Sequence, residues 1–265
     1  MKYMGSKQRI VNDILPIMLK YNKNDTFVDL FCGSCSVIQE VPPTYRRIAN
    51  DKNRYLIEMF KSLVDGKQFP TIINKETYSF HRDLYNKERK GEALLTREQY
   101  AEIGWCGWMA SYNGRFFSGG YSGHNVLTTN GKPRDYIKEQ INNTLKSLSS
   151  LKGIEFVSRD YNDVDIPLNS IVYCDIPYKD TKQYETSKNF DYERFYEWCR
   201  KNKGNYKIFI SEYSMPSDFI CVWQKEITNA MNQTKRYKLI EKLYTIKIIL
   251  IYKTQWLIKN TLNHR

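Results

Sequence analysis

Five short apolar segments, each running into small or polar residues, constrain the fold of this chain more than any other feature. They are rich in β-branched and aromatic residues, as strands are, and they span residues 26–31, 47–50, 153–158, 170–174 and 206–211. Between them, apolar residues recur at helical spacing over residues 55–63 and 190–201. This alternation predicts an α/β fold with a mostly parallel sheet.

The segment from residue 65 to residue 151 departs from the alternation. It contains a polar, aromatic and glycine-rich stretch at residues 111–125, which is followed by the basic residues Lys132 and Arg134. We interpret this segment as a subdomain inserted between the two halves of the sheet. The main domain would then comprise residues 1–64 and 152–265.

The charge of the chain indicates a class of partner. Lys and Arg number 41 and Asp and Glu 29, for a formal net charge of +12, and 41% of the residues are hydrophobic, which is too many for a disordered basic segment. A folded basic protein of this composition suggests nucleic acid as the partner. Net charge alone also fits a surface that only favours solubility.

The cysteines and histidines do not predict a metal site. Of the six cysteines only Cys32 and Cys35 form a C-x-x-C pair, and no second pair or nearby histidine completes a zinc set. The N-terminus lacks the apolar stretch of a signal peptide, and the most apolar segment, residues 246–258, is too short and too charged to span a bilayer. Scattered cysteines fit a reducing compartment, so we expect a soluble, cytoplasmic protein.

The turn after the first predicted strand is the strongest local signal. The strand ends at Asp29, and a small-residue turn containing Gly33 leads toward a helix. At the carboxyl end of a parallel strand, such a turn lets a ligand approach the main chain. With a single glycine it is not the dinucleotide fingerprint G-x-G-x-x-G. We expect Cys32 and Cys35 to belong to this turn rather than to act as a redox pair.

Asp51 follows the second predicted strand, 22 residues after Asp29. An acid in this place suits a carboxylate that accepts both hydroxyls of a ribose, which indicates a nucleoside cofactor. Asp is also a good N-cap, so the same residue can begin the helix that starts near Lys52.

The segment Asp175-Ile176-Pro177-Tyr178 follows the fourth predicted strand and can hold a planar base with an exocyclic amine. The Asp175 carboxylate and the Ile176 carbonyl offer two acceptors for the amine hydrogens, and the Tyr178 ring can stack on the base. Pro177 favours an extended Ile176, which helps to fix its carbonyl. These contacts lower the barrier only if they strengthen in the transition state. An ordinary turn can also carry these four residues by chance.

Several motifs occur together in one order. They are Y-x-G-S-K at residues 3–7, D-x-F-x-G-x at 29–34, A-N-D at 49–51, an acid–aromatic pair at 160–161, D-x-P-Y at 175–178 and I-S-E-Y at 210–213. In these motifs the chain resembles the Dam-type (D12 class) N6-adenine-specific DNA methyltransferases. The cofactor motif precedes the catalytic one, with the target-recognition region between them, which is the alpha arrangement of that family.

The resemblance implies a Rossmann-like, mostly parallel sheet of the S-adenosylmethionine-dependent methyltransferase type, with a mainly helical target-recognition subdomain at residues 65–151. It implies a cofactor pocket formed by Tyr3, Lys7, Asp29, Phe31, Gly33, Asp51, Asp160, Tyr161 and Asp175. The implied catalytic set is Asp175, Ile176, Pro177 and Tyr178. Lys7 would lie near the cofactor carboxylate, and Asp51 would accept the ribose hydroxyls.

Double-stranded DNA is the implied partner, and the inserted segment would read it. The side chains expected to contact DNA are Asn113, Arg115, Lys132 and Arg134. Arg and Asn can each form paired hydrogen bonds with base edges. The neighbouring aromatic residues either stack on bases or form the core of the subdomain; they are Phe116, Phe117 and Tyr121.

Two positions depart from the family pattern. Cys35 stands at the second glycine of the cofactor turn, where a side chain is strained if φ is positive. Ile176 stands at the first proline of D-P-P-Y and keeps the backbone carbonyl that the chemistry needs, but it gains an N–H group.

We therefore expect a site-specific DNA adenine-N6 methyltransferase of the restriction–modification kind, which transfers methyl from S-adenosylmethionine to an adenine flipped out of the duplex. Direct in-line transfer to the amine needs no covalent enzyme intermediate, so Cys174 is expected to be a packing residue rather than a nucleophile. Two alternatives stay open: methylation of another amine (cytosine N4 in DNA, or adenine in RNA), and a catalytically inactive DNA-binding protein. A nicotinamide-dependent oxidoreductase fits least, because the fingerprint glycines are missing.

Overall fold

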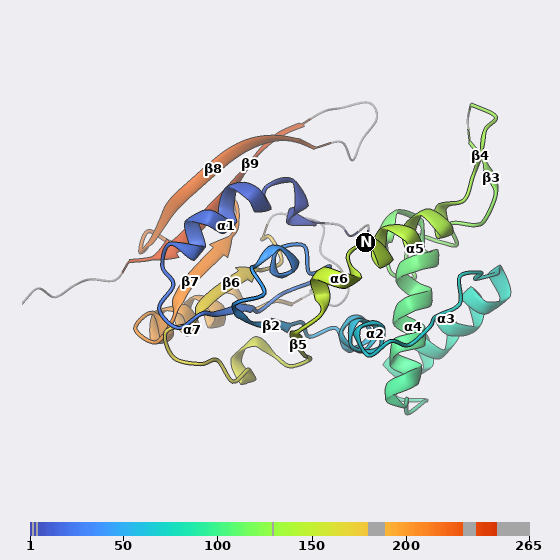
Figure 1. The fold of residues 1–265 in the computed structure, drawn as a ribbon, viewed down its shortest axis with the longest axis horizontal. Helices are drawn as coiled ribbons and strands as arrows, with labels where there is room; N and C mark the ends of the chain where they lie inside the picture. The colour runs from blue at the N-terminus through green and yellow to red at the C-terminus, as the bar shows by residue number, and fades with distance from the viewer. Residues whose placement is uncertain (2, 4, 129, 180–188, 230–236, 248–265) are drawn as a thin grey trace, which may run out of the picture.

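The computed structural model describes residues 1–247 except residues 2, 4, 129, 180–188 and 230–236. Its main element is a seven-stranded sheet in the order β5-β2-β1-β6-β7-β9-β8 (Figure 1). Five neighbouring strands are parallel: β1 (Thr26–Asp29), β2 (Arg46–Asn50), β5 (Ile154–Val157), β6 (Ile171–Asp175) and β7 (Lys207–Ser211). These are the five predicted strands, so the mostly parallel sheet is confirmed.

The last two strands of the sheet were not predicted. β9 (Tyr237–Ile246) pairs antiparallel with β7, and β8 (Phe219–Asn229) pairs antiparallel with β9. In β8 the apolar run at residues 219–223 passes directly into Gln224-Lys225-Glu226, and β9 mixes apolar and charged residues, so neither strand is apolar along its whole length as the parallel strands largely are. Of the apolar segment at residues 246–258, the residues from 248 onward lie outside the described part of the chain.

Helices cover both faces of the sheet. On one face, α1 (Val11–Leu19) and α2 (Arg54–Val64) contribute to a large apolar core, and on the other face α7 (Tyr192–Asn202) contributes to a smaller one. Successive side chains of β6 point to opposite faces of the sheet, so Tyr173 belongs to the first core and Cys174 to the second. Cys174 is fully buried, which agrees with a packing role. The helix predicted over residues 190–201 begins two residues later than expected.

The segment from 65 to 151 forms a group of helices beside the sheet (Figure 1). They are α3 (Lys75–Arg89), α4 (Arg97–Ala110), α5 (Tyr136–Lys146) and the short α6 (Leu148–Leu151). The Thr96 hydroxyl and the Gln99 side chain form a capping box that begins α4. Packing of α2 on α4 requires Gly104, since a Cβ there would lie 2.1 Å from the Tyr55 carbonyl oxygen.

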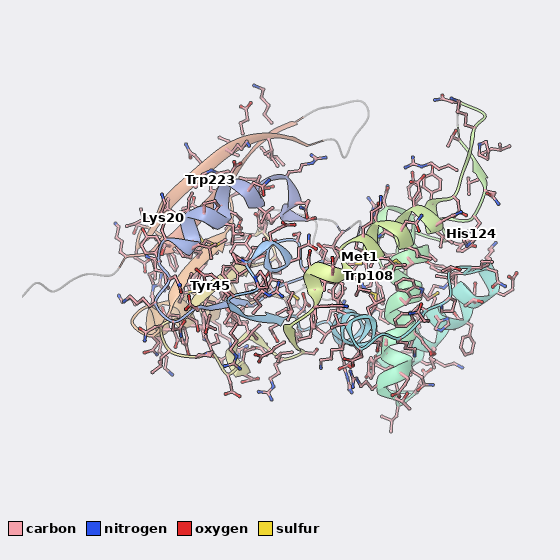
Figure 2. The ribbon with its side chains drawn as sticks, in the orientation of Figure 1. Met1, Lys20, Tyr45, Trp108, His124 and Trp223 are labelled. Atoms are coloured by element: carbon pink, nitrogen blue, oxygen red, sulfur yellow. The ribbon has the colours of Figure 1, made fainter. Side chains whose placement is uncertain are left out.

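A small hairpin projects from this helical group (Figure 1). Its strands, β3 (Val126–Leu127) and β4 (Pro133–Arg134), pair antiparallel and are exposed. At its base the His124 imidazole contacts the Asp135 carboxylate at 2.8 Å and accepts a hydrogen bond from the Ile73 N–H (Figure 2). The boundaries of two separate domains stay a prediction.

Short 3₁₀ turns connect several of these elements; they are Lys7–Arg9, Ile38–Glu40, Tyr112–Gly114 and Tyr161–Asp163. Within the described ranges, no helix combines the length and the apolar character needed to cross a membrane.

Candidate active site

The sheet has a topological switch point between β1 and β6. From β1 the chain proceeds outward through β2 to β5, and it then returns to the other side of β1 to form β6 and β7. In parallel α/β sheets, ligands bind beyond the carboxyl ends of the strands at such a point. Asp29 ends β1 and Asp175 ends β6, while Asp51 directly follows β2. The sheet therefore brings three predicted carboxylates to one edge.

Asp29 is the most buried of the three carboxylates. Its carboxylate accepts hydrogen bonds from the backbone N–H groups of Phe31 and Ile38, yet within the described part of the chain its Oδ1 has no hydrogen-bond partner. Burial, reinforced by the negative charges of Asp175 and Asp51, raises the pKa of Asp29 well above its usual value. A buried oxygen without a partner is costly, so this edge is suited to a ligand that donates a hydrogen bond or carries positive charge.

Asp51 connects the glycine turn to the end of β2. Its Oδ2 accepts from the Gly33 N–H at 3.0 Å, and its Oδ1 accepts from the Asn53 N–H at 2.8 Å. Burial raises its pKa, and these two hydrogen bonds oppose the rise. The alternative in which Asp51 caps the following helix is wrong, because the N-cap of α2 is Asn53, whose side chain accepts from the Leu56 N–H.

The turn itself has two residues with positive φ. Gly33 has φ of 44°, and a Cβ there would lie 3.0 Å from the Tyr3 ring, so only glycine allows this close approach. Cys35 has φ of 60° and is fully buried, which is the strained case anticipated for the missing second glycine. Burial raises the pKa values of the Cys32 and Cys35 thiols, so both are neutral members of the turn.

Lys7 and Asp175 form a buried ion pair. The Lys7 Nζ lies 2.7 Å from Asp175 Oδ1 and also donates to the Gly5 carbonyl at 3.1 Å. The side chain of Lys7 is 6% exposed and that of Asp175 is 22% exposed, so the carboxylate is the more accessible partner. Burial raises the pKa of Asp175 to about 6, with Lys7 lowering it and Glu241 raising it further. Lys7 therefore has a protein carboxylate as its partner in this structure.

Tyr178 is held by three neighbours. The Lys7 Nζ lies 4.8 Å from the ring centroid, and the Tyr213 ring meets it edge-on with centroids 4.5 Å apart. Its hydroxyl donates to Glu241 Oε2 at 2.7 Å. Between Asp175 and Tyr178, the Ile176 side chain is buried in the smaller core.

A second group of predicted cofactor residues packs beside this edge. Phe31 contacts Tyr161 with ring centroids 5.6 Å apart, and Tyr161 is buried with its pKa raised to about 12 by burial. Asp160 caps the short turn that holds Tyr161 and lies 3.4 Å from the Arg194 guanidinium and 3.7 Å from the Lys52 ammonium. The sheet thus brings all the predicted cofactor residues toward the same edge.

Sequence reasoning missed three buried polar residues at this edge: Asn50, Glu212 and Glu241. Asn50 donates to the Leu30 and Arg159 carbonyls at 3.0 and 3.1 Å, so it fixes the ends of β1 and β5 to that of β2. Glu212 accepts from the N–H groups of Lys179 and Tyr213. Asn50 and Glu212 lie within the A-N-D and I-S-E-Y motifs, which could have identified them.

The predicted DNA-contacting residues lie elsewhere, on the helical group and its hairpin. Asn113, Arg115, Lys132 and Arg134 are all exposed. Arg134 forms two hydrogen bonds of 2.8 Å with the Glu139 carboxylate, and its guanidinium lies 4.7 Å from the Tyr136 ring centroid. Asn113 adopts a positive φ of 56°, which Asn tolerates better than most residues.

The aromatic residues of this segment mostly form its core. Phe116 and Phe117 are buried and contact each other with centroids 4.7 Å apart. A Cβ at Gly107 would lie 2.3 Å from the Phe116 ring, so this glycine lets the rings pack on α4. The Tyr121 hydroxyl donates to the Ile73 carbonyl at 2.6 Å. Base stacking by Phe116 and Phe117 is therefore not supported.

The helical group joins the sheet next to the glycine turn. The Tyr3 ring, which lies against Gly33, also contacts the Trp108 ring of α4 with centroids 5.0 Å apart. Figure 2 labels Met1 and Trp108 at this junction. No group of three or more His, Cys, Asp or Glu side chains that could hold a metal ion occurs among the described residues.

The fold and this edge define the class of protein. A doubly wound sheet with a final antiparallel pair, with carboxylates around its switch point, is a Rossmann-like fold of the S-adenosylmethionine-dependent methyltransferase type. The chain belongs to the D12 class N6 adenine-specific DNA methyltransferase family, whose model matches residues 3–246. The resemblance inferred from the motifs is thereby confirmed.

Similar proteins include one curated relative and two solved structures. The type II methyltransferase M.FokI of Planomicrobium okeanokoites is 27% identical over 200 residues, which cover 67% of this chain and 28% of that protein. The rRNA methyltransferase aviRa of Streptomyces viridochromogenes has a TM-score of 0.38 at 12% identity, covering 90% of this chain and 84% of its own. The structure of SMU.472 complexed with SAH has a TM-score of 0.38 at 10% identity. That match covers 92% of this chain and 54% of the SMU.472 chain.

Proposed function

We propose that this protein methylates the N6 amine of adenine in double-stranded DNA, with S-adenosylmethionine as the methyl donor. The observation that carries the proposal is the position of Asp175-Ile176-Pro177-Tyr178 at the switch point, in a chain that belongs to an adenine-specific family. There the Asp175 carboxylate is partly accessible and the Tyr178 ring lies beside it.

The residues at the edge fit this donor. Asp29 has a buried oxygen without a partner in the described chain, and Asp51 and Asp175 add negative charge close by. S-adenosylmethionine carries a sulfonium, an ammonium and two ribose hydroxyls, which suit such acceptors. When bound, it supplies an electrophilic methyl group. We propose that the pocket is formed by Tyr3, Lys7, Asp29, Phe31, Gly33, Asp51, Asp160, Tyr161 and Asp175.

The proposed role of the chain is to hold the amine. The Asp175 carboxylate and the Ile176 carbonyl each accept a hydrogen bond from the amine. These two hydrogen bonds concentrate the nitrogen lone pair on the side that faces the methyl group. A carboxylate has about four acceptor positions, so Asp175 can bind the amine while Lys7 favours its ionised form. Stacking on Tyr178 offsets part of the few kcal/mol needed to flip the base out of the duplex.

We propose that the segment from 65 to 151 binds the DNA around the target. Asn113, Arg115, Lys132 and Arg134 are exposed on it, and two of them lie on the projecting hairpin or its turn. Basic side chains there would contact phosphates or guanine, and the Asn113 amide would suit adenine.

The direct test is transfer of labelled methyl to duplex DNA, followed by nucleoside analysis, with Asp175→Ala as the inactive control. We expect N6-methyladenine from the wild-type protein and none from the variant. N4-methylcytosine, or label found only in RNA, would assign another amine as the substrate. Binding of DNA without any methyl transfer would identify an inactive binding protein and overturn the proposal.

A further inference from the structure

Glu241 is a buried carboxylate that no motif accounts for. It lies on β9, where Glu241, Leu243 and Thr245 share one face of the strand and are all buried. Leu243, two residues further along, is fully buried in the larger core. The register of β9 thus places an ionisable side chain in a row that is otherwise apolar or hydroxylic, where an unpaired charge costs free energy.

The partner of Glu241 is the hydroxyl of Tyr178. The two side chains are 63 residues apart in sequence and share a hydrogen bond of 2.7 Å between two buried groups. They meet because β9 pairs with β7, and β7 pairs with β6, the strand that leads into Tyr178. Hydrogen bonds to a carboxylate are shorter and about twice as strong as those between neutral groups.

Stacking on a base uses the face of a tyrosine ring, and for that purpose the hydroxyl is not needed. A phenylalanine in this place would have the same face, but the far end of its ring would lack the hydrogen bond to Glu241. In this structure the Tyr213 ring lies nearly perpendicular to the Tyr178 ring, and the Glu241 carboxylate accepts from the hydroxyl at the far end of Tyr178. We propose that Glu241 is a positioning residue, which holds the Tyr178 ring through its hydroxyl in the orientation that receives the target base. This inference rests on the proposed methyltransferase function.

The charge of Glu241 has a second, separable effect on Asp175. The titratable groups that lie close enough to interact electrostatically with the Asp175 carboxylate include Lys7, Asp29, Tyr173, Cys174, Tyr178, Tyr213 and Glu241. Among them Glu241 raises the pKa of Asp175 and Lys7 lowers it. Removing the negative charge of Glu241 should therefore lower the pKa of Asp175, so that Asp175 stays ionised at lower pH.

The test is a double-mutant cycle on methyl transfer. Glu241→Leu should lower kcat/KM about tenfold, as expected for loss of a hydrogen bond to a charged group. In the Tyr178→Phe background the same substitution should cause no further loss, because the hydroxyl through which it acts is already gone. Glu226→Gln is the matched control: this glutamate lies on the neighbouring strand, pairs with Lys238 and is 54% exposed, so kcat/KM should not change.

Glu241→Gln provides a second readout and does not depend on an apolar substitution. Its amide oxygen can still accept from Tyr178, so kcat/KM at pH 8 should stay within about threefold of the wild-type value. The acidic limb of the pH profile should move to lower pH. Equal losses from Glu241→Leu in both backgrounds, or a loss as large from Glu241→Gln as from Glu241→Leu, would overturn the inference. Absence of N6-methyladenine with the wild-type protein would instead overturn the proposed function.

Discussion

The switch-point edge and the hairpin of the helical group hold their polar side chains in opposite ways. At the edge, Asp29, Asp51 and Asp175 are largely enclosed and are held by backbone N–H groups or by a buried ammonium. On the hairpin, Lys132 and Arg134 are exposed, and Arg134 pairs with Glu139 at the surface. Exposed ion pairs contribute little stability, whereas removing one member of a buried pair is costly.

This difference indicates a division of labour. Fixed acceptors with altered pKa values suit a chemical step in which atoms must be placed within a fraction of an ångström. Exposed cations that exchange partners suit a surface that meets a polyanion and releases it. We therefore expect substitutions at the edge to change turnover, and substitutions on the hairpin to change affinity for DNA.

The largest expected effect separates the two regions most sharply. Asp175→Asn should lower kcat by about a thousandfold, because the amide replaces a charged acceptor with a neutral side chain. Its affinity for duplex DNA should stay within about threefold of the wild-type value, since the hairpin is untouched. Initial rates of labelled methyl transfer and fluorescence anisotropy with labelled DNA measure the two quantities. A loss of affinity as large as the loss of turnover would contradict the division.

The pH dependence should distinguish the regions next. Burial raises the pKa of Asp175 to about 6, and the acceptor must be ionised, so kcat/KM should rise with pH and level off above this value. At pH 5 it should be about tenfold below the plateau, one unit below the pKa. DNA affinity over the same range should change much less, because lysine and arginine side chains ordinarily titrate well above pH 8. A flat rate profile between pH 5 and 8 would argue against an ionised Asp175 acceptor.

Two substitutions at the Arg134–Glu139 pair should change the affinity for DNA in opposite directions. Arg134→Ala should weaken DNA binding about fivefold and reduce the salt slope of binding by about one, as for loss of one phosphate contact. Glu139→Gln should strengthen binding about twofold, because it removes a negative charge and one of the two acceptors that hold Arg134 at the surface. Anisotropy titrations at several salt concentrations measure both. If both substitutions weaken DNA binding to the same extent, Arg134 acts only through its pairing with Glu139.

The smallest expected effect concerns backbone strain. Cys35→Gly and Cys35→Ala both remove the sulfur, but only glycine relieves a φ of 60°. The glycine variant should therefore be about 1 kcal/mol more stable than the alanine variant. Asn113→Gly, at one of the positive-φ positions of the segment from 65 to 151, should gain less, because Asn tolerates this conformation. Urea unfolding of the three variants measures these differences, and a more stable alanine variant would contradict the strain.

The parallel strands and the switch-point carboxylates were predictable because a few adjacent residues are enough to indicate each of them. A buried strand that ends in an acid gives a local pattern, as at Asp29 and Asp175, and the sheet then assembles these ends at one edge. The other predicted site residues also came from short motifs, such as A-N-D for Asp51 and D-x-P-Y for the catalytic set. The expectation that Cys35 is strained if its φ is positive also followed from one position in a turn. In the structure the φ of Cys35 is positive.

The contacts that were missed join residues far apart in sequence. Lys7 meets Asp175 across 168 positions, and Tyr178 meets Glu241 across 63, so no local pattern could indicate either pair. Asp51 was wrongly offered as a helix cap because Asn53, two residues later, is an equally good candidate. Phe116 and Phe117 could equally face bases or a core, and only the packing on Gly107 decided between them.

The order of the last strands affects how the molecule is made. β8 is attached to the sheet only through β9, although it precedes β9 in the chain. As the polypeptide leaves the ribosome, β8 therefore emerges before the strand that will hold it, with apolar side chains such as Phe219 and Trp223 still uncovered. Without β9, β7 would be an open border of the sheet, and we expect nascent chains that still lack β9 to have the greatest need for a chaperone.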